Sequence, residues 1–91
     1  MEISVTHDPS EKELEELGAL AWPTWEKEVS TFPWNYGEAE TCYVLEGKAK
    51  ITDKANGLAT EIGAGDLVVF PSGLICEWEV IEPIRKHYNF G

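Results

Sequence analysis

Tight-turn signals recur along the chain at short intervals, and this feature limits the fold more than any other. The clearest are Asn56-Gly57, the stretch from Gly63 to Asp66, and Pro71-Ser72-Gly73. Between them lie only short stretches that are apolar or alternate between apolar and polar residues, with a turn about every six to ten residues. Many short strands with frequent turns are typical of a β-barrel or β-sandwich. The sequence therefore predicts an all-β domain.

The strands that we expect follow directly from these turns. In residues 75–81, for example, Cys76 and Trp78 alternate with Glu77 and Glu79, so the two kinds of side chain point to opposite faces. The other expected strands are 25–30, 41–45, 48–52, 58–62, 67–70 and 84–90.

The N-terminal part differs from the rest. Residues 2–6 alternate as a half-buried strand does. Ser10 is a good helix N-cap, Glu13 stands three residues later as its capping-box partner, and Gly18 is a helix stop. The sequence predicts one short N-terminal helix over residues 11–17.

Length and charge exclude several classes of protein. The 91 residues suffice for one domain, 1–91. The net charge is −10, from 17 acidic and 7 basic side chains, which argues against nucleic acid and against anionic membranes as partners. No apolar run approaches the roughly 20 residues that span a bilayer. The start lacks a basic stretch followed by an apolar one, so we expect a cytoplasmic protein, with a removed transit peptide as the open alternative.

Two spacings carry a resemblance to a known family. Glu40 is followed by six residues and Gly47; Gly65 is followed by five residues and Pro71, one residue and Gly73, and two residues and Cys76. These regions, about 32–47 and 65–80, resemble the two motifs of the cupin superfamily, G-x5-H-x-H-x3-4-E-x6-G and G-x5-P-x-G-x2-H-x3-N. The resemblance implies an RmlC-like, jelly-roll (double-stranded β-helix) barrel.

A narrower resemblance is to the (S)-ureidoglycine aminohydrolase cupin domain family. It is carried by Trp22–Val29, by Glu40–Gly47 and by Arg85–Asn89. This resemblance implies a small-molecule pocket and, in many small cupins, a homodimer.

The sequence departs from the cupin pattern where the metal ligands should be. The family holds a divalent metal with three His and one Glu, but here the H-x-H pair maps onto Trp34-x-Tyr36 and the third His onto Cys76. Glu40 remains, and the final Asn is replaced by Val80. The resemblance thus implies a degenerate metal site.

Two interpretations of the site stay open. In one, Glu40, Cys76 and His87 together hold Zn, Fe, Ni or Mn. In the other there is no metal, Glu40 acts as a general base and Cys76 as a nucleophile or redox thiol, with His87 as the third catalytic candidate.

The expected ligand-binding residues are mainly aromatic. Trp34, Tyr36 and Trp78 would form a flat wall for an organic ligand, unless they only pack the barrel. Arg85 shares a face with His87 by strand parity and would grip a carboxylate or ureido group, with Lys86 pointing the other way. Because Pro83 can shift the register, the inward or outward facing of Arg85 and His87 stays open at this point.

Two functions remain to be compared. The first is a small-molecule-binding cupin, in its enzymatic form acting on a small polar or ureido-type metabolite. The alternative is a non-catalytic dimeric module that binds a ligand or a protein.

Overall fold

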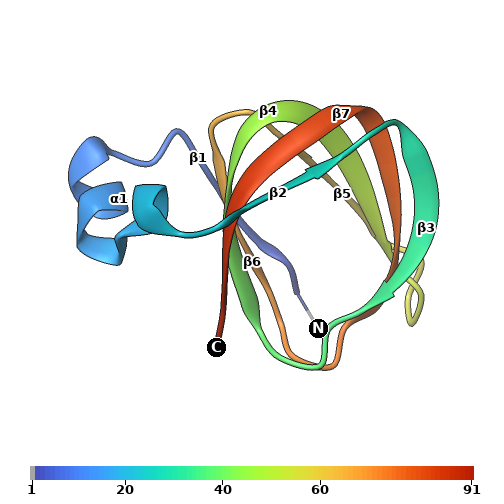
Figure 1. Cartoon of the computed structure of the whole chain (residues 1–91). Helices are drawn as coiled ribbons and strands as arrows, with labels where there is room; N and C mark the ends of the chain where they lie inside the picture. The colour runs from blue at the N-terminus through green and yellow to red at the C-terminus, as the bar shows by residue number, and fades with distance from the viewer. Residues whose placement is uncertain (1) are drawn as a thin grey trace.

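One antiparallel sheet of seven strands makes up most of the described chain, residues 2–91. In this computed structural model the sheet curls into a barrel, and the helical segment projects from one side of it (Figure 1). The prediction of an all-β barrel with one short N-terminal helix is confirmed. The strands are β1 (Ser4–His7), β2 (Thr24–Lys27), β3 (Ser30–Asn35), β4 (Glu40–Asp53), β5 (Ala59–Gly63), β6 (Asp66–Phe70) and β7 (Ile75–Phe90).

The topology is set by two long strands. The sheet order is β1-β6-β4-β7-β2, while β3 also pairs with β7 and β5 also pairs with β4. Every other strand except β1 therefore forms hydrogen bonds with β4 or β7, and β1 pairs with β6. Because both strands bend sharply along their length, they carry the sheet around the interior (Figure 1).

The bend in β4 coincides with irregular pairing. The β4–β7 register shifts between Val44 and Ala49, as β-bulges do where a strand bends. Gly47 lies there with φ +94°, and a Cβ at this position would sit 2.2 Å from the carbonyl oxygen of Pro83. Only a residue without a side chain lets the two backbones approach so closely.

Some predicted strands are joined in the structure. The expected strands 41–45 and 48–52 are parts of β4, and 75–81 and 84–90 are parts of β7. Pro83 does not end β7, because the register shift leaves it without a paired residue in β4. A proline, which has no N–H to donate, is tolerated at such a bulge.

The predicted helix has the predicted ends. Helix α1 spans Glu11–Leu17, and the hydroxyl of Ser10 accepts a hydrogen bond from the backbone N–H of Glu13 at 3.1 Å. Gly18 closes it in the left-handed conformation, with φ 70°. A 3₁₀ turn, η1 (Ala19–Ala21), then leads to the barrel. No helix within residues 2–91 is long and apolar enough to cross a membrane.

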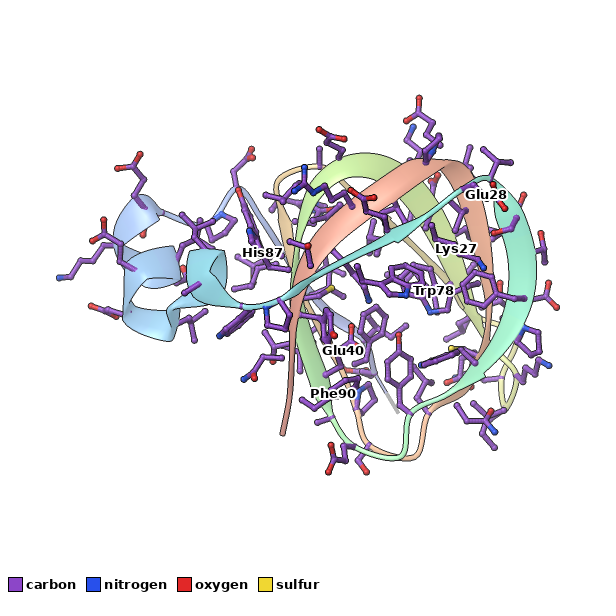
Figure 2. All side chains as sticks on the ribbon, viewed as in Figure 1. Lys27, Glu28, Glu40, Trp78, His87 and Phe90 are labelled. Carbon is purple, nitrogen blue, oxygen red and sulfur yellow. The ribbon has the colours of Figure 1, made fainter. Side chains whose placement is uncertain are left out.

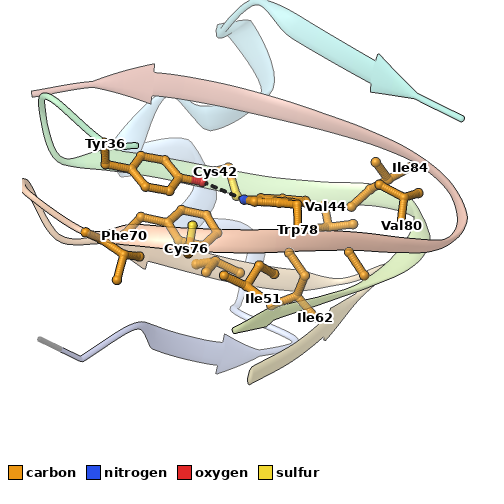
Figure 3. Packing of buried hydrophobic residues seen from close by; sticks show 13 residues of the cluster. Tyr36, Cys42, Val44, Ile51, Ile62, Phe70, Cys76, Trp78, Val80 and Ile84 are labelled. Atoms are coloured by element: carbon orange, nitrogen blue, oxygen red, sulfur yellow. Dashed lines mark hydrogen bonds between the residues drawn. The ribbon is translucent and has the colours of Figure 1, made fainter. Parts of the chain in front are cut away.

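The barrel interior is filled by one cluster of side chains (Figure 3). Both cysteines belong to it as buried free thiols. In a smaller cluster, Leu14 and Ala19 of the helical segment pack against Leu67 of β6. The main cluster consists of Tyr36, Cys42, Val44, Ala49, Ile51, Ile62, Val68, Phe70, Leu74, Cys76, Trp78, Val80 and Ile84.

Candidate functional site

A cavity of about 230 Å³ opens at one end of the barrel. It lies between β2, β3, β4 and β7, and Trp34 at its mouth is 46% exposed. Glu40 and Trp78 point into the barrel, with Phe90 nearer its end (Figure 2). The lining residues are Trp25, Phe32, Trp34, Tyr36, Glu40, Trp78, Lys86, Tyr88 and Phe90.

Stacked aromatic rings form the walls. Phe32 lies parallel to Trp78, with ring centroids 6.1 Å apart and planes 11° apart, and Trp25 meets Trp78 edge-on at 5.9 Å. Tyr36 stacks on Phe70 with a centroid distance of 4.7 Å. The indole N–H of Trp78 donates a hydrogen bond of 3.1 Å to the hydroxyl of Tyr36 (Figure 3). These contacts fix the orientation of each ring, so the walls are preorganised.

Tyr36 stays a neutral phenol in this setting. Burial raises its pKa far above the ordinary value, and the carboxylate of Glu40 raises it further. The position that the cupin pattern gives to a histidine ligand therefore holds a hydrogen-bonded phenol.

A buried ion pair is the polar feature of the cavity. Nζ of Lys86 donates a hydrogen bond of 2.5 Å to Oε2 of Glu40, and both side chains are about 5% exposed. The same Nζ lies 5.0 Å from the ring centroid of Trp25, 4.8 Å from that of Trp78 and 5.6 Å from that of Phe70. Carboxylate and ring faces together stabilise the ammonium in a largely apolar cavity.

The expected orientation of the last strand is wrong. Lys86 and Tyr88 line the cavity, whereas Arg85 and His87 lie outside it. Nε of Arg85 lies 3.4 Å from a carboxylate oxygen of Glu26, and Nδ1 of His87 lies 2.8 Å from the carbonyl oxygen of Trp22. Figure 2 shows His87 on the side of the barrel toward the helical segment. The buried residues of β7 are even-numbered from Cys76 and Trp78 to Lys86, except for the exposed Glu82 beside the bulge.

Sequence reasoning missed Lys86 although a signal for it was present. Simple alternation from Trp78 along β7 places Lys86 and Tyr88 inside. The assignment of Arg85 and His87 to the pocket depended on the effect of Pro83 on the register. The partner that makes a buried Lys86 stable, Glu40, lies 46 residues away in the sequence.

Cys76 lies in the barrel interior but does not line the cavity. Its Sγ contacts the carbonyl oxygen of Trp34 at 3.5 Å. Burial, together with the negative charge of Asp53, raises the pKa of Cys76 to about 11. The thiol is therefore protonated near neutral pH, which makes it a poor nucleophile there.

The donors do not assemble into a divalent-metal site. Glu40, Cys76 and His87 are not brought together: one is bound to an ammonium group, one lies in the core and one lies outside the cavity. Between residues 2 and 91, no group of three or more His, Cys, Asp and Glu is placed to hold a metal ion. The ammonium of Lys86 lies beside the carboxylate of Glu40, the one conserved ligand position that the sequence keeps.

Comparisons with known proteins agree with this architecture. A family model described as "EutQ-like cupin domain" matches residues 14–88. The crystal structure of a DUF861 family protein from Thermotoga maritima is 50% identical, with 99% of this chain and 100% of that chain covered and a TM-score of 0.94. The search of curated proteins found no match.

Two further solved structures are more distant. The EutQ protein of Clostridium difficile is 25% identical over 74% of this chain, with a TM-score of 0.67, and the chain spans only 52% of its length. A DUF1255 protein of unknown function from Acidithiobacillus ferrooxidans is 26% identical over 70% of this chain and 60% of that chain, with a TM-score of 0.67.

Proposed function

Because this chain belongs to the family of EutQ-like cupin domains, we propose that its barrel is a binding site for a small, planar, uncharged organic molecule, held without a metal ion. The observation that carries the proposal is the buried pair of Glu40 and Lys86 in a cavity with aromatic walls. Buried ion pairs often stabilise a fold no better than apolar side chains of the same size. Folding stability is therefore a weak explanation for this pair, and a role in ligand binding is the better one.

The size and walls of the cavity favour a single ring with a short substituent. Cavities of about 150 Å³ bind benzene, and this one measures about 230 Å³. The ring planes of Phe32 and Trp78 are nearly parallel, so a flat ligand would stack beside them.

The ion pair favours a ligand with a carbonyl oxygen next to an N–H group. The ammonium of Lys86 supplies donors for the oxygen, and the carboxylate of Glu40 supplies an acceptor for the N–H. Amides and ureido compounds have this arrangement. The narrower sequence resemblance to ureidoglycine aminohydrolase domains agrees with a ureido-type ligand.

The indole N–H signals of the four tryptophans test the proposal. Trp25, Trp34 and Trp78 line the cavity, whereas Trp22 packs in the smaller cluster beside the helix. With benzamide as the probe, we expect saturable shifts of the three cavity signals in two-dimensional ¹⁵N NMR spectra and none of the fourth.

A matched pair of variants provides the control. Trp34→Ala should weaken benzamide binding about ten-fold through lost stacking. Ile75→Ala changes an exposed apolar side chain that does not line the cavity, so it should leave binding unchanged. Shifts of Trp22 alone, or no saturable shift, would contradict the proposal.

A further inference from the structure

We infer that Glu40 and Lys86 form an acid–base pair that moves a proton at a carbon next to the carbonyl group of a small, uncharged ketone. The inference rests on the proposed binding function, because it assigns chemistry to the same cavity. The inference is based on the N–H donors of Lys86 and the carboxylate oxygen of Glu40 that have no hydrogen-bond partner within residues 2–91.

Two of the three N–H donors of Lys86 have no acceptor among the surrounding groups that the structure describes. An ammonium group carries three N–H donors, and here one of them binds Oε2 of Glu40. The groups around Nζ are the rings of Trp25, Phe70 and Trp78, which attract the charge but offer no oxygen. Burying N–H donors without acceptors is costly, so a ligand oxygen beside Nζ would complete the site.

Glu40 likewise keeps one oxygen free. Oε2 binds Lys86, whereas Oε1 makes no hydrogen bond to any described residue. In residues 2–91 no fully enclosed side-chain oxygen or nitrogen lacks a partner, so Oε1 is reached by solvent, and the cavity that Glu40 lines provides this access. A carboxylate oxygen open to a cavity is available to accept a proton.

The free N–H groups of Lys86 and the free oxygen of Glu40 can act as the acid and the base of one reaction. A carbonyl oxygen placed at Nζ of Lys86 brings the neighbouring carbon toward Oε1 of Glu40. Oε1 takes a proton from that carbon, the C–H electron pair forms a C=C bond, and the C=O π pair moves to the oxygen. The oxygen takes a proton from Nζ, which leaves an enol, a neutral amine and a protonated Glu40. In the reverse step the carboxyl group of Glu40 returns a hydron to the carbon and the enol oxygen returns its proton to Nζ. The carboxyl proton exchanges with the solvent that reaches Oε1, so in D₂O the carbon takes up deuterium.

The substrate should be uncharged, because a cation would lose its hydration among the apolar walls and an anion would not be attracted. The carboxylate already neutralises the ammonium, and the chain as a whole carries a net charge of −10, so neither adds a net attraction for an anion. The apolar walls lower the local dielectric constant, which strengthens both hydrogen bonds.

Acetophenone is a direct probe of this chemistry. It carries a ring and a carbonyl group as benzamide does, but it also has a methyl group that can enolise. In D₂O, the protein should accelerate the loss of the methyl proton NMR signal over the rate in buffer. Glu40→Gln should lower the protein-dependent rate by about 100-fold or more, the range of general acid–base catalysis.

Additional variants keep the result interpretable. Glu40→Gln leaves an unpaired buried ammonium group that can unfold the barrel, whereas Glu40→Gln with Lys86→Met removes both charges and should fold. Glu79→Gln removes the carboxylate of an exposed pair, 3.5 Å from Lys50, and should leave the exchange rate unchanged.

Three outcomes are distinguishable because the indole signals report binding separately. Binding of acetophenone, with exchange that is lost in the double variant, supports the inference. Binding without accelerated exchange overturns the acid–base role but leaves the binding function. Failure to bind, seen as unchanged cavity indole signals, overturns both.

Discussion

Lys86 lies in an environment that is unusual for lysine. Three aromatic rings and one carboxylate surround its ammonium group, and together they replace the water that the charge loses on burial. The aliphatic stem of the side chain adds apolar contacts with the surrounding walls. The pair therefore gives the cavity a fixed donor next to a fixed acceptor.

The two thiols give a prediction for alkaline pH. Burial raises the pKa of Cys42 to about 12 and that of Cys76 to about 11, whereas unfolded thiols ionise near pH 9. Above that pH the unfolded chain binds fewer protons than the native one, so stability falls as the pH rises toward the native pKa values. Between pH 8 and 10 the free energy of unfolding should fall by roughly 1 to 3 kcal/mol.

Urea titrations at a series of pH values measure this loss. The variant Cys42→Ala with Cys76→Ala is less stable because it leaves cavities, but its stability should depend less on pH. An equally steep decline in the variant would mean that other groups cause it.

At the scale of the elements, the crossing of β4 and β7 decides the shape of the barrel. Gly47 and Pro83 meet where the register shifts, and both are residues that fit an irregular ladder. The segments that the sequence predicted as separate strands are thus continuous through the bend. β4 and β7 each contain residues at the bend and residues that line the cavity.

A glycine pair tests the importance of this crossing. Gly47→Ala would place a Cβ 2.2 Å from the oxygen of Pro83 and should destabilise the protein by more than about 2 kcal/mol, or prevent folding. Gly57→Ala has a similar positive φ, +73°, but open space around it, so it should cost only about 1 kcal/mol. Chemical denaturation compares the two, and equal costs would show that the close approach is unimportant.

At the scale of the whole molecule, charge repulsion opposes folding. The net charge of −10 is spread over a molecule of 34 × 25 × 20 Å. At 10 mM salt the screening length is about 30 Å, so the charges repel across the entire molecule, whereas near 150 mM it is about 8 Å. Raising NaCl from 10 to 150 mM should therefore increase the free energy of unfolding by about 1 kcal/mol.

The control reduces the charge itself. Glu15→Gln with Glu16→Gln changes two exposed helix residues far from the cavity and should make the salt effect smaller. If urea titrations show no rise with salt in the wild-type protein, long-range repulsion is not a significant part of its stability.

Membership of the cupin superfamily, predicted from motifs within residues 32–80, is confirmed by the family model that matches residues 14–88. The narrower resemblance to ureidoglycine aminohydrolase domains, the homodimer and the cytoplasmic location stay predictions.

Local signals in the sequence determined the helix and the approximate positions of most strands, but neither β3 nor the continuity of β4 and β7. Ser10 and Gly18 define the helix because capping depends on neighbouring residues, and the turn glycines and prolines indicate the strands because backbone preference is local. The cavity residues Glu40, Tyr36 and Trp78 were found through motif spacing and alternation.

The tertiary structure alone decided what surrounds those residues. Glu40 and Lys86 are 46 residues apart, and only the pairing of β4 with β7 brings them within hydrogen-bond distance. The same pairing absorbs Pro83 in a bulge, keeps β7 continuous and leaves His87 outside. The carboxylate that stabilises the buried ammonium group is a long-range contact, so local residue patterns do not predict it.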